Sequence, residues 1–250
     1  MCGILGIVNN IKVNSKDFKK ILKKIQHRGQ ESFGISYIDE SNNIIIDKHK
    51  GMIDNCEINH FTSHFLIGHN RYSTSGKSKD SYSIDQCHLE TQPFYGKNKC
   101  GEFVLVHNGN IPHYQKLMKQ FNINTSVNIN TSVNSDTEFL LRWFEKSQED
   151  NWLDILKTLL KSIKSAYCLI ILTNDKLFVV RDSYGVRPLC IGYNETGWCV
   201  SSESCVLTDY NFLRDVRSGE ILEINKDEIK TLYIEKINKK AHCLFEYVYF

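Results

Sequence analysis

The run Met1-Cys2-Gly3-Ile4-Leu5-Gly6-Ile7-Val8 decides how the rest of the chain is interpreted. The apolar stretch after its cysteine predicts a first β-strand. Removal of Met1 would leave a thiol and a free α-amine on Cys2, and an α-amine with a reference pKa of about 7.7–8.0 accepts a proton near neutral pH. A nucleophile and a candidate base would then share one residue. The structural alternative is that Cys2 is a small buried apolar residue at the start of a strand.

Composition excludes several classes of protein. The chain has 250 residues, 41% of them hydrophobic, and a formal charge of +2. That charge gives no electrostatic reason to expect nucleic acid, and no apolar run approaches the roughly 18 residues of a membrane span. We recognise no signal peptide, and the nine cysteines form no Cys-x-x-Cys pair. We therefore expect free thiols in the reducing cytoplasm, with neither a membrane nor a nucleic-acid partner.

Short apolar runs and helical periodicity predict an α+β fold. The predicted strands are Gly3–Val8, Phe33–Ile38, Phe65–His69, Phe103–His107, Tyr167–Leu172, Leu177–Val180, Trp198–Ser201 and Ile221–Ile224. The predicted helices are Lys16–Gln26, Asp136–Phe144 and Trp152–Ile163. Many strands and few helices favour two sheets with helices packed outside them over a doubly wound parallel sheet. The hexapeptide INTSVN occurs twice in succession over 123–134, which indicates a surface loop with no assigned function.

An Asn-Gly pair follows a strongly apolar strand at Asn108 and Gly109. An asparagine amide and a neighbouring glycine N–H can converge on one point and stabilise an oxyanion. The structural alternative is that Asn-Gly marks a tight turn.

Two charged residues match the two ends of a free amino acid. Arg71 follows an apolar strand, and its guanidinium fork suits a carboxylate, with a polar stretch after it that could close over a ligand. Asp136 stands with Ser135 at a predicted helix start, where a carboxylate could hold an ammonium group. The alternatives are a surface salt bridge for Arg71 and a helix cap for Asp136.

Two polar turns, His27–Gln30 and Arg181–Pro188, are interpreted as structural corners that contain satisfied ion pairs. The histidines have no distinguishing context, and we interpret them as structural.

Several segments, in this order, resemble those of class II glutamine amidotransferases, which are N-terminal-nucleophile hydrolases. The resemblance is strongest to the glutaminase domain of amidophosphoribosyltransferases and spans nearly the whole chain. It is carried by Met1–Ile7, His27–Glu31, Gly68–Tyr72, Gln92–Phe94, His107–Asn110, Ser135–Asp136, Arg181–Leu189, Ser202–Ser204 and Phe245–Phe250.

The resemblance implies a four-layer αββα sandwich, with residues 1–250 forming one glutaminase domain. It implies that Cys2 is the nucleophile and that its own α-amine is the base. The Asn108 side chain and the Gly109 N–H would form the oxyanion hole.

The same resemblance assigns the substrate contacts. Arg71 would bind the α-carboxylate of L-glutamine and Asp136 its α-ammonium group. Tyr72 and Thr74 would belong to the loop that closes over the substrate. Hydrolysis would then yield glutamate and ammonia through a thioester on Cys2.

In the resembling enzymes the ammonia forms phosphoribosylamine for purine synthesis on a phosphoribosyltransferase domain. We find no motif of that domain in this chain, so we expect the ammonia acceptor to be a synthase domain or partner chain outside it. We expect no cofactor in this chain, although the resembling enzymes use Mg²⁺ at the phosphoribosyltransferase site and some carry an iron–sulfur cluster. Cys243 matches one ligand position of that cluster. Homo-oligomer formation is left open.

Two other functions remain open at this stage. The chain could be a degenerate amidotransferase module that acts in binding or regulation without catalysis. It could also be an acylase that uses an N-terminal cysteine on a different amide.

Overall fold

The computed structural model describes residues 1–72, 90–123, 135–237 and 239–249. Thr74 and nearly all of the INTSVN repeat lie outside these ranges. Every strand pairing among the described residues is antiparallel.

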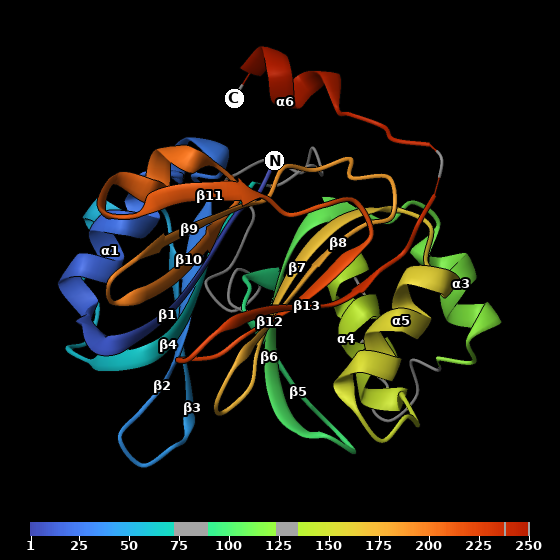
Figure 1. The fold of residues 1–250 in the computed structure, drawn as a ribbon, viewed down its shortest axis with the longest axis horizontal. Coiled ribbons are helices and arrows are strands. Elements are labelled where there is room, and N and C mark those ends of the chain that lie inside the picture. Colours follow the sequence, from blue (N-terminus) through green and yellow to red (C-terminus); the bar gives the residue numbers. More distant parts are fainter. Residues whose placement is uncertain (73–89, 124–134, 238, 250) are drawn as a thin grey trace.

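The strands form two sheets (Figure 1). The first sheet has seven strands in the order β11-β9-β10-β1-β4-β2-β3. Their bounds are β1 Gly3–Asn14, β2 Ser32–Ile38, β3 Ile44–Lys50, β4 Thr62–Arg71, β9 Cys190–Asn194, β10 Gly197–Ser201 and β11 Asn211–Asp215. The second sheet has six strands in the order β13-β12-β8-β7-β6-β5. Their bounds are β5 Phe94–Asn98, β6 Gly101–Asn110, β7 Ala166–Leu172, β8 Leu177–Arg181, β12 Glu220–Ile224 and β13 Ile229–Ile234.

Helices cover the outer face of each sheet. The α-helices are α1 Ser15–Lys23, α3 Tyr114–Gln120, α4 Asp136–Lys146, α5 Trp152–Ser162 and α6 Leu244–Tyr249. Short 3₁₀ helices are η1 Gln26–Arg28, η2 Ile53–Asn55 and η4 Ser204–Asp209. Figure 1 shows α1 against the first sheet, α4 and α5 against the second, and α6 near the N-terminus.

Three hydrophobic cores define the layers. One lies between the two sheets and contains Ile4 and Val106. A second joins the second sheet to α4 and α5, and a third joins the first sheet to α1. The four-layer α+β sandwich predicted from the sequence is therefore confirmed.

Side-chain caps set the starts of the long helices. Asn14 accepts a hydrogen bond from the Asp17 N–H at 3.0 Å at the start of α1, and Ser135 accepts one from the Glu138 N–H at 3.1 Å at the start of α4. These bonds satisfy backbone donors that have no partner inside the helix. The cap of α4 matters for function because it fixes the backbone on either side of Asp136.

Candidate active site

Strand β1 directs Cys2 toward the space between the sheets. Ile4 and Val8 belong to the core between the sheets, whereas Leu5 and Ile7 belong to the core beneath α1. Because successive side chains in a strand alternate between the two faces, Cys2 lies on the face of Ile4, at the edge of the interface between the sheets.

The two charges predicted to bind substrate act on the Cys2 thiol. Burial raises the pKa of this thiol; among its charged neighbours, the Asp136 carboxylate also raises that pKa and the Arg71 guanidinium lowers it. The thiol donates a long hydrogen bond to the Tyr72 carbonyl, with an S···O distance of 3.9 Å. The structure therefore brings together Cys2, Arg71, Tyr72 and Asp136, which are far apart in the sequence.

Met1 directly precedes the nucleophile Cys2 in the sequence. While Met1 is attached, the nitrogen of Cys2 is a peptide nitrogen and cannot act as a base. Burial lowers the pKa of the Met1 amine, and the Met1 sulfur contacts the Arg187 guanidinium.

Asn108 offers a buried donor on the opposite sheet. Val104 and Val106 of β6 belong to the core between the sheets, so alternation places Asn108 on the same face. Its side-chain nitrogen is buried and has no hydrogen-bond partner among the described residues. A buried N–H group without a partner is costly, which makes this amide a strong candidate to bind a ligand oxygen.

The Asn-Gly pair lies inside a strand. Asn108 pairs with Cys168 and Gly109 with Tyr167 in the antiparallel ladder between β6 and β7. The alternative interpretation of this pair as a tight turn is therefore wrong. A Cβ atom on Gly109 would lie 2.2 Å from the Ala166 carbonyl oxygen, so glycine is required by the close packing here.

Arg71 ends strand β4 and forms an ion pair with Glu90. Its side chain is 15% exposed, so this is a half-buried pair at the edge of the site and not an isolated surface salt bridge. Tyr72 is exposed. Thr74, the remaining predicted substrate residue, lies outside the described residues.

Asp136 is the first residue of α4, and Ser135 is the residue that caps the helix. The alternative interpretation of Asp136 as the helix cap is therefore wrong, because the side chain of Ser135 caps the helix. The Asp136 carboxylate accepts a hydrogen bond from the Ile111 N–H at 3.0 Å, which ties the helix to the segment that follows β6.

Arg28 is a residue whose role the sequence did not reveal. Its side chain is fully buried, and its Nε donates to the Cys2 carbonyl at 3.0 Å. The guanidinium also binds Glu203 at 2.6 Å and Glu246 of α6 at 2.9 Å. The predicted corner with satisfied ion pairs is confirmed, but the same arginine also fixes the backbone of the nucleophile.

The following glycine joins this turn to Arg71. A Cβ atom on Gly29 would lie 2.5 Å from the Arg71 carbonyl carbon. The Arg28-Gly29 pair therefore holds the backbones of Cys2 and Arg71 close together. Nothing in the sequence around Arg28 indicates that a distant backbone carbonyl is its partner.

The second polar turn is structural, as predicted. Arg181 donates to the carbonyls of Gly185, Arg187 and Val216 at 2.9, 2.8 and 2.6 Å. Asp182 accepts backbone N–H groups of the same turn.

His69 lies under the site and is not an acid–base group at neutral pH. Burial, with smaller contributions from the neighbouring His107 and Arg71, lowers its pKa to about 3. The structural interpretation of this histidine agrees with its burial.

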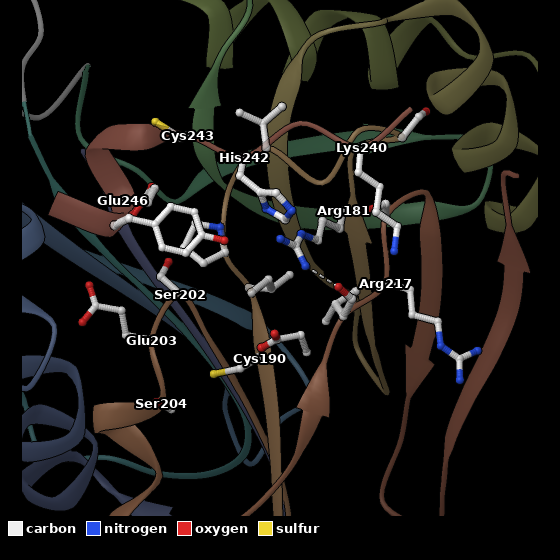
Figure 2. Close-up of a pocket in the computed structure, with 18 of the residues that line it drawn as sticks. Arg181, Cys190, Ser202, Glu203, Ser204, Arg217, Lys240, His242, Cys243 and Glu246 are labelled. Carbon is white, nitrogen blue, oxygen red and sulfur yellow. Dashed lines mark hydrogen bonds between the residues drawn. The ribbon is translucent and has the colours of Figure 1, made fainter. Parts of the chain in front are cut away.

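A large cavity of about 1170 Å³ borders the buried Arg28, but Arg71, Asn108 and Asp136 do not line it. Figure 2 shows Glu203 and Glu246 on one side of it and Arg217 and Lys240 on the other. The described residues that line it do not include Cys2. The cavity therefore does not identify the site of the chemistry.

The described residues offer no group of three or more His, Cys, Asp or Glu side chains that could hold a metal ion. The Cys243 sulfur accepts a hydrogen bond from Arg187 at 3.1 Å. An iron–sulfur cluster needs several cysteine ligands, so Cys243 and its described neighbours do not fit one. No helix in the described part of the chain is long and apolar enough to cross a membrane.

Comparisons with known proteins identify the family. The model of the glutamine amidotransferase domain family matches residues 79–209, just over half of the chain. That range contains Asn108, Gly109 and Asp136. The chain belongs to the glutamine amidotransferase domain family.

The individual proteins that this chain resembles include amidophosphoribosyltransferases. It is 34% identical to an amidophosphoribosyltransferase of Methanocaldococcus jannaschii, over all of this chain and 56% of the relative. It is 36% identical to the human amidophosphoribosyltransferase, over 90% of this chain and 48% of the relative. The solved structure of the glutamine phosphoribosylpyrophosphate amidotransferase of B. subtilis, complexed with ADP and GMP, matches with a TM-score of 0.84 and 30% identity, over all of this chain and 52% of that one. The chain thus spans about half the length of the relatives it matches.

Proposed function

We propose that this chain hydrolyses the side-chain amide of L-glutamine, with Cys2 as the nucleophile once Met1 has been removed. The observation that carries the proposal is the unpartnered, buried amide nitrogen of Asn108, on the face of the second sheet that looks toward Cys2. The opposite charges of Arg71 and Asp136 beside the thiol support a free amino acid as the substrate.

The charges of Arg71 and Asp136 match the two charged groups of a free amino acid. A free amino acid presents one carboxylate and one ammonium group, and Arg71 and Asp136 are complementary to this pair. The Asp136 carboxylate is held by the Ile111 N–H, so its position is set before the substrate arrives. With both ends held, the side-chain amide would extend toward Cys2.

The chemistry then needs only Cys2 and the oxyanion donors. The free α-amine of Cys2 takes the thiol proton, and the sulfur attacks the amide carbonyl carbon. The Asn108 amide and the Gly109 N–H stabilise the negative oxygen that forms. The protonated amine passes its proton to the leaving nitrogen, and ammonia departs from a γ-glutamyl thioester. Water, deprotonated by the same amine, cleaves the thioester to glutamate and regenerates the thiol.

The ammonia acceptor is proposed to be a synthase domain or partner chain that packs on helix α6. Glu246 of this helix has a side chain only 7% exposed and binds Arg28, whereas Leu244, Phe245 and Tyr249 are 73%, 62% and 68% exposed. A short helix that buries its acid and exposes its apolar residues is suited to a protein partner. The amidophosphoribosyltransferase relatives, which are about twice as long, support phosphoribosylamine formation for purine synthesis as the use of the ammonia. We propose the cytoplasm as the location.

Glutamate release tests this proposal. The purified chain, with loss of Met1 confirmed by mass, should convert glutamine to glutamate and ammonia. The Cys2→Ala variant should be inactive, and Cys205→Ala, which removes an exposed thiol, should retain activity. An intact, processed chain that releases no glutamate, with or without an added synthase domain, would refute the proposal.

Loss of the oxyanion donor should lower kcat. Asn108→Ala should reduce kcat by about 10²–10³, because one preorganised donor to the developing charge is lost. KM for glutamine should change little. Asn211→Ala, at an exposed asparagine on an edge strand, is the matched control. A fall in kcat of less than about threefold would remove Asn108 from the mechanism.

Loss of the carboxylate-binding charge should instead raise KM. Arg71→Ala should raise KM for glutamine by roughly 10- to 100-fold, because a charge-assisted hydrogen bond contributes about 1.5–3 kcal/mol. Arg142→Ala, on the exposed face of α4, is the control. Steady-state kinetics that show the same KM for the Arg71→Ala variant and the unmodified chain would contradict the assignment.

A further inference from the structure

A buried polar network lies behind the strand that carries the oxyanion donors. The Gln92 side-chain nitrogen donates to the Thr137 hydroxyl at 3.1 Å, and Nδ1 of His107 lies 3.0 Å from the same hydroxyl. The three residues are 6%, 4% and 2% exposed. Buried polar groups are costly to leave without partners, so this cluster holds its members in place.

The side chain of Gln92 binds the backbone of β6 just beyond the end of its ladder with β5. The ladder between β5 and β6 ends at the pair Phe94 and Leu105, two residues before His107. Beyond that pair, the side chain of Gln92 forms the hydrogen bonds to β6. Its oxygen accepts the His107 N–H at 2.6 Å, and its nitrogen donates to the His107 carbonyl at 3.4 Å. A side chain thus fixes both backbone groups of the residue directly before Asn108.

Helix α4 is attached to this strand on both sides of the oxyanion donors. On one side Thr137 binds the His107 ring. On the other side Asp136, the residue before Thr137, binds the Ile111 N–H at 3.0 Å. The two attachments bracket Asn108 and Gly109.

The directions of the hydrogen bonds are consistent with a neutral histidine. The Thr137 hydroxyl accepts from the Gln92 amide, so its own hydrogen is available for Nδ1 of His107. Burial lowers the pKa of His107. The ring lies on the face opposite Asn108, so it does not reach the reacting atoms.

We infer that Gln92, Thr137 and His107 are positioning residues, which fix the distance between the oxyanion donors on β6 and the ammonium-binding carboxylate at the start of α4. Both ends of the substrate must fit at once: its ammonium group on Asp136 and its amide oxygen on Asn108. A shift of α4 against β6 would move one contact away from the other. This inference rests on the proposed glutaminase function and assigns a role to Gln92, which that function does not use.

The test is a substitution that removes the central hydroxyl. Thr137→Val should lower kcat for glutamine by roughly 10- to 100-fold, because small misplacements of reacting groups have effects of this size. Thr137→Ser, which restores the hydroxyl, should recover kcat to within about threefold. Thr173→Val is the matched control, because Thr173 is also buried and its hydroxyl also forms hydrogen bonds, as a donor within a turn at the end of the β6–β7 ladder away from Asn108.

A purely structural role predicts a different pattern. It would lower the melting temperature of Thr137→Val and Thr173→Val alike and leave kcat of the folded enzyme within about twofold, which would overturn the inference. If Thr137→Val does not fold, Gln92→Met provides the same test, since it removes the bonds to His107 and Thr137 at similar side-chain volume. Loss of kcat in folded Gln92→Met supports the inference, and unchanged kcat overturns it.

The two proposals can fail separately. A wild-type chain that releases no glutamate would refute the proposed function, and the inference with it. An active wild-type chain beside an equally active Thr137→Val variant would refute the inference alone.

Discussion

The contact between the two sheets fixes where the chemistry of this protein can occur. Ile4 of β1 and Val106 of β6 share one buried core, and each lies two residues from a functional side chain on the same face. Strand alternation then directs Cys2 and Asn108 into the edge of that interface. A one-residue slip of either strand would send its functional side chain to the opposite face. The apolar pattern of the two strands therefore maintains the catalytic geometry as well as stability.

Buried charge organises the surroundings of the nucleophile. Arg28 is fully buried, and it holds the Cys2 carbonyl together with the carboxylates of Glu203 and Glu246. Removing one partner from such a group leaves uncompensated charge, so the three segments are held together strongly. Because Glu246 belongs to α6, the most exposed apolar helix in the described structure is linked by one side chain to the backbone of the nucleophile.

Most of the central strands could be predicted from the sequence, whereas the edge strands could not. The predicted strands all occur, and five were missed: β3, β5, β11 and β13, which are the edges of the two sheets, and β9, which lies between β10 and β11. Edge strands are half solvated, so runs such as Asn211–Asp215 lack a continuous apolar signal. Helix α6 was missed because it is short and none of its residues is buried as a whole.

The functional residues divide in a similar way. Cys2, Arg71, Asn108 and Asp136 have side-chain chemistry that suggests a role, and the structure brings Arg71 and Asp136 to the thiol. Gln92 and Arg28 bind backbone carbonyls and N–H groups of distant segments. No pattern of residue types in the sequence indicates such partners. The Asn-Gly pair shows the opposite problem, because a dipeptide typical of turns lies within a strand that close packing requires to carry glycine.

The central claim is that Cys2 is a nucleophile in a pocket for a free amino acid. The most direct measurement is peptide mapping by mass spectrometry after treatment of the processed chain with an electrophilic glutamine analogue. We expect one label per chain, on Cys2, and protection by excess L-glutamine. Labelling of the exposed Cys205 in place of Cys2, or labelling of Cys2 that glutamine does not prevent, would contradict it.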